Sequence, residues 1–205
     1  MKSISKHLFI VLVTFLTTSL AFFVAAQDVD KRLDEAQSAY NAGNLEAARF
    51  ALQQAMNEVD LAIGQEILKL LPSNMGNMGY KEADDQVGSA SMGFAGLYVN
   101  RSYTSDENAS VNVQVIADSP LLAGINTILA LPLFGSDPNQ KRIRVGNYRS
   151  LLQKSEGSDG QVSWDIQVPF GSSLLTLNYK GIPEENVVVE MANTLPVDQI
   201  SRLVQ

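Results

Sequence analysis

Cysteine is absent from this chain of 205 residues, and histidine occurs only once, at His7. Without cysteine the fold has no disulfide, no cysteine nucleophile and no thiolate metal ligand. His7 lies in a segment that we expect to be removed, so Ser-His-Asp triads and histidine metal sites are excluded as well. We therefore predict no catalytic residue, no metal and no cofactor.

Basic residues are also scarce. The chain has 15 Lys and Arg against 22 Asp and Glu, which gives a net charge of −7. A chain of this charge is repelled by phosphate backbones and by anionic membrane surfaces. The composition therefore predicts no nucleic-acid partner.

Long apolar runs are rare, and the one that occurs lies at the N-terminus. Lys2 and Lys6 precede the apolar residues 8–23, and the small residues 24–26 suit cleavage before Gln27. We predict a signal peptide over residues 1–26 and export to a bacterial periplasm. The alternative is an uncleaved anchor, because a membrane-spanning helix needs about 20 apolar residues. After cleavage we expect no stable membrane insertion.

Residues 27–72 are predicted to form a helical hairpin. Apolar residues recur every three or four positions, and Pro72 ends the second helix. These positions are Val29, Leu33, Ala36 and Tyr40, and then Leu45, Ala48, Leu52, Met56, Val59, Ile63, Ile67 and Leu70.

The hairpin resembles a single tetratricopeptide (TPR) unit, because Ala36, Gly43, Leu45, Ala48, Leu52 and Ala55 have matching offsets. One such unit cannot bury its own apolar face. We expect most of the apolar stripe to pack against the rest of the chain, and the alternative is a partner protein. Leu52, Val59 and Ile63 are candidate interaction residues.

Residues 73–96 are predicted to be a connector rich in Gly, Ser and Met, with a short strand near 80–83. Residues 97–205 are predicted to form an α+β domain. Alternating apolar and polar residues indicate strands at 97–103, 111–115, 142–152, 162–168 and 174–179, and helices at 120–131 and after Pro183. We predict an antiparallel sheet of about five to six strands that helices cover on one face.

Three segments, 68–72, 110–122 and 146–152, resemble an uncharacterised family of exported bacterial proteins. That resemblance implies no activity and no site residue. The order of strands and helices is similar to that of Mog1/PsbP-like domains, which implies a binding or assembly module.

Two further groups of residues are candidate binding surfaces. Arg142, Arg144 and Arg149 form a basic cluster for an acidic partner or an anion, unless they are simply a solvated strand face. The helix at 120–131 packs in the core or lines an apolar groove, whose candidate residues are Leu121, Leu122, Ile125, Ile128 and Leu129. Trp164 is assigned to the core face of its strand.

These features favour a non-catalytic periplasmic interaction or assembly module, whose partner is another envelope protein. The alternative is a carrier of a small apolar molecule held between the sheet and the helix at 120–131. A third hypothesis is a hydrolase that uses paired carboxylates such as Asp84-Asp85 or Asp106-Glu107, although adjacent acids in turns are usually solvated.

Overall fold

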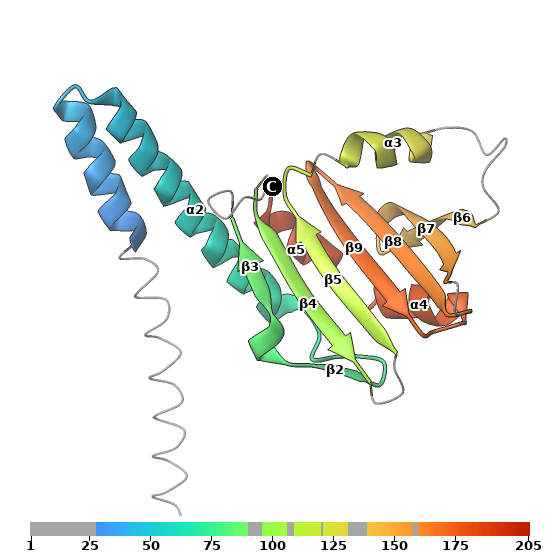
Figure 1. Cartoon of the computed structure of the whole chain (residues 1–205). Coiled ribbons are helices and arrows are strands. Elements are labelled where there is room, and N and C mark those ends of the chain that lie inside the picture. The colour runs from blue at the N-terminus through green and yellow to red at the C-terminus, as the bar shows by residue number, and fades with distance from the viewer. Residues whose placement is uncertain (1–27, 90–95, 106–108, 120, 131–138, 158–159) are drawn as a thin grey trace, which may run out of the picture. The chain divides into compact units, whose positions relative to one another are not determined.

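A computed structural model describes residues 28–89, 96–105, 109–119, 121–130, 139–157 and 160–205 (Figure 1). The predicted signal peptide, Asp106 and Glu107 lie outside these residues. Two compact units are present, residues 1–62 and residues 63–205. None of the helices within the described residues has the length and apolarity that a membrane span requires.

The first unit contains a helical hairpin, as predicted. Helix α1 covers residues 28–41, and α2 runs over Leu45–Leu70 and so continues into the second unit. Gly43 has a φ of +74°, which suits glycine at the end of a helix. The Asn44 side chain then accepts a hydrogen bond from the Ala47 amide at 3.1 Å and caps the start of α2.

The second unit is built on a nine-stranded antiparallel sheet in the order β1-β2-β4-β5-β9-β8-β7-β6, with β3 also paired to β4. The α+β class is therefore confirmed. The strands are β1 (Asn74–Met75), β2 (Met78–Tyr80), β3 (Gln86–Gly88), β4 (Tyr98–Thr104), β5 (Ser110–Ile116), β6 (Gln140–Val145), β7 (Tyr148–Glu156), β8 (Val162–Phe170) and β9 (Ser173–Lys180).

The sheet has more strands than the five to six predicted, for two reasons. The segment predicted as one strand over 142–152 is the hairpin β6–β7, which turns at Gly146 with a φ of +56°. The connector also contributes β1, β2 and β3, together with a short 3-10 helix, η1 (Glu82–Asp84). Short strands of two or three residues have too few alternating positions to be recognised by period.

One face of the sheet carries the main core. Helices α4 (Glu185–Ala192) and α5 (Val197–Leu203) pack on it together with the last turns of α2. Trp164 lies in this core, as predicted, and its indole N–H donates to the Ile182 carbonyl at 2.9 Å. The indole N–H is the one polar group of the ring, and this hydrogen bond replaces the bond to water that it loses on burial.

Helix α3 (Leu122–Ala130) adds no described residue to that core. In residues 121–129 Ile125 is buried, Leu122 and Leu129 are half-buried, and Leu121 and Ile128 are exposed. Arg142, which alternates with the core-facing Ile143, donates to the Ile128 carbonyl at 2.7 Å. Helix α3 therefore lies on the face opposite α4 and α5, so the helices cover both faces of the sheet and not one face as we expected.

The C-terminal end of α2 is held by polar groups from β4. Arg101 donates to the Leu71 carbonyl, and the Tyr103 hydroxyl donates to the Pro72 carbonyl at 2.7 Å. Burial raises the pKa of Tyr103 to about 12, so the hydroxyl keeps its proton at physiological pH. These donors reach carbonyls that have no partner within the helix.

Candidate functional site

The helical hairpin exposes a set of large apolar side chains. Each has between 43% and 67% of its surface exposed, although residues of this kind are usually buried in soluble proteins. We call six of these residues the hairpin face: Leu33, Tyr40, Leu45, Leu52, Met56 and Val59. Phe50 is also exposed, but at 3.6 residues per turn it lies about 140° around α2 from Leu45 and is not part of this face.

Small residues, in contrast, are buried where the two helices pack. Ala36 of α1 and Ala48, Ala51 and Ala55 of α2 are all buried. Small side chains allow two helix backbones to approach closely. These four alanines therefore form the contact between α1 and α2, and the large apolar residues are not needed for it.

The large residues have the same offsets from the alanines on both helices. Leu33 and Tyr40 lie three residues before and four residues after Ala36, and Leu45 and Leu52 stand in the same relation to Ala48. An antiparallel pair of helices is related by a twofold axis perpendicular to both, so equal offsets place these residues on the same side. The hairpin face is therefore one surface made by two helices.

The rim of the hairpin face is acidic. Asp30, Asp34 and Glu46 are exposed and adjoin the apolar positions, with Arg49 as the opposing charge. Residues 28–62 together carry seven acidic and three basic side chains. A partner that covers this face therefore meets a negative potential at its edges.

The structure separates the three candidate residues predicted on α2. Leu52 and Val59 belong to the exposed hairpin face, whereas Ile63 is half-buried and packs against the core of the second unit. Within the second unit the stripe packs in the core from Ile63 onward, as expected, whereas Leu45, Leu52, Met56 and Val59 in the first unit are exposed. The spacing of apolar residues does not show where the exposed part of α2 ends and the buried part begins, because the same helical period runs through both parts.

The three predicted arginines share one face at the β6–β7 edge. Arg144 and Arg149 are directly paired across the two strands and both are exposed. Arg142 caps α3 through the Ile128 carbonyl, and Arg144 donates to the Asn147 carbonyl at 3.2 Å. The cluster therefore includes one arginine with a structural role and a cross-strand pair that faces solvent.

The predicted apolar groove residues lie on α3 or just before it, and within the described part of the chain their side chains differ in burial. Ile125 is buried, Leu122 and Leu129 are half-buried, and Leu121 and Ile128 are exposed. This arrangement gives little support to an apolar carrier site.

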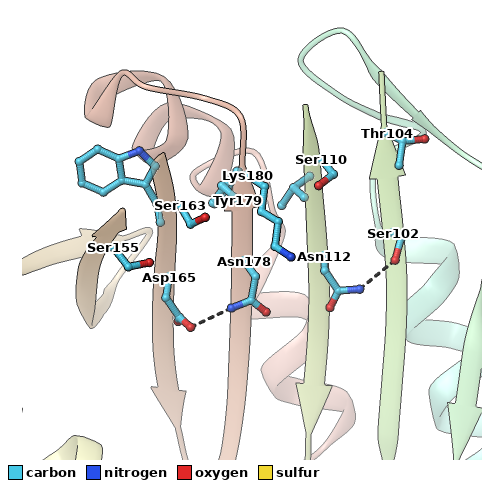
Figure 2. A pocket seen from close by; sticks show the side chains of 12 residues that line it. Ser102, Thr104, Ser110, Asn112, Ser155, Ser163, Asp165, Asn178, Tyr179 and Lys180 are labelled. Carbon is cyan, nitrogen blue, oxygen red and sulfur yellow. Dashed lines mark hydrogen bonds between the residues drawn. The ribbon is translucent and has the colours of Figure 1, made fainter. Parts of the chain in front are cut away.

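A hollow of about 660 Å³ lies elsewhere on the sheet, on the face opposite the main core (Figure 2). Residues from five adjacent strands line it, and their side chains form two rows in register across the strands. One row is Thr104, Ser110, Lys180, Ser163 and Ser155, and the other is Ser102, Asn112, Asn178 and Asp165. We call this site the polar hollow. The polar hollow was not predicted from the sequence, because polar residues at alternate strand positions occur on every solvent-exposed sheet face.

Hydrogen bonds fix the second row of the polar hollow. Asn112 donates to the Ser102 hydroxyl and Asn178 donates to the Asp165 carboxylate, each at 2.8 Å (Figure 2). The other side-chain oxygens of Asn112 and Asp165 are buried without a hydrogen-bond partner. Burial raises the pKa of Asp165, against the effect of hydrogen bonds from Gln167 and Asn178.

Of the acidic pairs proposed for hydrolysis, Asp106-Glu107 lies outside the described residues, so only Asp84-Asp85 can be placed. Asp85 is paired with Arg101 on the core side of the sheet. Asp165 is the one carboxylate among the described residues that line the polar hollow. Glycosidases that use two carboxylates hold both beside the reacting bond, and the described geometry shows no such pair.

No family model matches the chain, and comparisons with curated proteins and with solved structures found no match. The resemblances to an exported bacterial family and to Mog1/PsbP-like domains therefore remain unconfirmed.

Proposed function

We propose that this chain is a non-catalytic interaction module of the bacterial envelope, and that its hairpin face binds an amphipathic helix of another envelope protein. The observation that carries the proposal is the exposure of six large apolar residues on one surface of the hairpin. Extended apolar surfaces are uncommon on soluble monomers and usually mark sites of association.

A helix is the partner element that fits this surface. The hairpin face runs along a pair of helices, and its part on α2, from Leu45 to Val59, is about 21 Å long. In TPR-like arrays such a pair is covered by the helices of the next unit. A partner helix can therefore lie between the two rows of apolar side chains, as helices do in other apolar grooves.

The charges around the hairpin face favour a different protein over a second copy of this chain as the partner. Two hairpins with seven acidic and three basic residues each would bring like charges together at the rim. A helix with Lys or Arg beside its apolar stripe would instead be attracted to Asp30, Asp34 and Glu46. We therefore propose a partner helix with basic flanks, and we expect its binding to weaken as salt rises.

The test is a double substitution, Leu52→Asp with Val59→Asp. Both side chains are about half exposed, so the protein should stay folded while the hairpin face gains two charges. We expect affinity for the partner helix to fall at least about 100-fold, since charges buried against apolar groups without a partner are strongly unfavourable. The matched control is Ser38→Asp with Gln54→Asp, which adds the same charge on the other side of the hairpin.

The partner itself can be found with a photo-crosslinking residue at position 52 in living cells, followed by peptide mapping of the adduct. We expect one envelope protein, linked through an apolar helix that carries Lys or Arg. A synthetic peptide of that segment should bind the purified chain, and the double variant should lose this binding. Adducts formed only with a second copy of the chain, or equal peptide binding by both double variants, would overturn the proposal.

A further inference from the structure

We propose that the polar hollow is a binding site for a neutral oligosaccharide. The observation behind this inference is that five adjacent strands place hydroxyl and amide side chains in two registered rows around one hollow (Figure 2). The site is separate from the hairpin face, and the inference does not depend on the partner proposed above.

The lining has the hydrogen-bonding groups that a polyhydroxyl ligand needs. Hydroxyls such as those of Ser110 and Ser163 both donate and accept, and the side chains of Asn112 and Asn178 offer amide groups in fixed orientations. A sugar presents the same mixture of donors and acceptors around its ring. Each row therefore offers several positions at which one sugar hydroxyl can be bound.

Two acceptors in the hollow lack a partner within the described part of the chain. Asn112 and Asp165 each keep one buried side-chain oxygen without a hydrogen bond. A buried acceptor in this state is unfavourable. A small rotation of the side chain would bring either oxygen to the wall of the hollow, where a ligand hydroxyl could donate to it, which favours ligands rich in hydroxyl donors.

The charges of the lining favour a neutral ligand. Asp165 and Lys180 are the two ionisable residues of opposite sign among the described residues in the rows, so the hollow has no excess of either charge. An anionic ligand would meet one carboxylate, and it would also approach a chain whose net charge is −7. Phosphorylated or sulfated molecules are therefore poorer candidates than an uncharged glycan.

Peptides and apolar molecules fit the hollow less well. The five strands around it lie inside the sheet and not at its edges, so little backbone is open to an added peptide strand. Val111, Trp164 and Tyr179 also line the hollow, but all three are buried, so neither ring presents an open face for a large apolar ligand. The volume of about 660 Å³ lies within the usual range for small-molecule sites. Without a stacking ring we expect weak binding, with a Kd of about 1 mM.

The test is saturation-transfer and chemical-shift NMR on the purified chain, with cellotetraose, maltotetraose and chitotetraose as neutral probes. A sulfated heparin tetrasaccharide serves as the anionic probe. We expect at least one neutral probe to saturate with shifts at Asn112, Asp165 and Asn178, and the anionic probe to give none.

Three variants decide whether the hollow is responsible. Ser163→Trp should fill it and Asn112→Ala should remove one polar contact, so each should weaken binding at least about fivefold. Gln114→Ala is the control, because Gln114 lies two residues along the same strand and face but outside the hollow. Asn112→Ala keeps the test valid if Ser163→Trp fails to fold. The proposal is wrong if no neutral probe saturates, if the anionic probe binds as well, or if Gln114→Ala weakens binding as much as Asn112→Ala.

Discussion

Arg101 is the charged residue most completely enclosed by this fold. Its guanidinium donates to Asp85 at 2.8 Å, lies 3.8 Å from the centre of the Tyr80 ring and also reaches the Leu71 carbonyl. Both members of the Arg101–Asp85 pair are more than nine-tenths buried. One side chain thus joins the end of α2, the loop before β3 and the strand β4.

Arg101→Ala should therefore be strongly destabilising. The substitution leaves the Asp85 carboxylate buried without its cation, which costs about 3–5 kcal/mol in comparable pairs. The measurement is the free energy of unfolding in urea. Arg32→Ala is the control, because its pair with Glu35 is largely exposed and should contribute less than about 1 kcal/mol. Similar losses in the two variants would contradict the structural role given to Arg101.

Among single residues, burial was predicted correctly where apolar and polar residues alternate along a strand. Trp164 was placed on the core face because its neighbours alternate between apolar and polar, and the structure confirms that position. Arg101 could not be recognised in the same way. Its strand neighbours Val99 and Tyr103 are buried and apolar, and the counter-charge that makes its burial possible is distant in sequence.

At the scale of the element, α2 contains a glycine that helix propensity does not explain. Gly64 lies in mid-helix, where glycine costs about 1 kcal/mol relative to alanine. A Cβ atom at this position would lie 2.3 Å from a methyl carbon of Val87 in β3 and 3.1 Å from a methyl carbon of Leu97. The glycine therefore allows a strand to pack directly against the helix.

Gly64→Ala should consequently destabilise the protein, although propensity alone predicts the opposite. The branched Val87 side chain cannot move aside freely, and overpacking of this kind costs about 1–3 kcal/mol. Thermal unfolding followed by circular dichroism is the measurement. Gly64→Ala combined with Val87→Ala should recover part of the loss, since the second change removes the overlapping methyl groups. A single variant more stable than the parent chain would show that the helix and strand are less closely packed than described.

The elements themselves were predicted unevenly, for physical reasons. Long periodic helices and strands with one wet face were recognised, including the two helices of the hairpin and the meander from β7 to β9. The turn at Gly146 was missed because apolar residues occur on both sides of it at spacings that one continuous strand would also show. The position of helix α3 was not predicted because its apolar composition indicates burial, whereas Leu121 and Ile128 of this segment are exposed.

At the scale of the whole molecule, the two proposed sites belong to different units and use different chemistry. The hairpin face belongs to residues 1–62 and is apolar with an acidic rim, whereas the polar hollow belongs to residues 63–205 and has no excess charge. The sequence indicated Leu52 and Val59 of the hairpin face as candidate interaction residues without showing whether they are covered, and it did not indicate the polar hollow. An apolar stripe has the same sequence pattern whether or not another surface covers it. The polar hollow depends on strand register, which brings residues distant in sequence side by side only in the folded sheet.

Helix α2 is continuous, yet its residues belong to two compact units. Amide hydrogen exchange should therefore change sharply within a single helix. Amides of Ile67 and Leu68, which lie in the main core, should exchange only with unfolding of the whole sheet, whereas those near Leu52 should exchange at least about 100-fold faster. Occupation of the hairpin face would slow the fast amides and leave the slow ones unchanged. Uniform protection along α2 would instead mean that both units unfold as one, so the rate profile reports how far the cooperative unit extends.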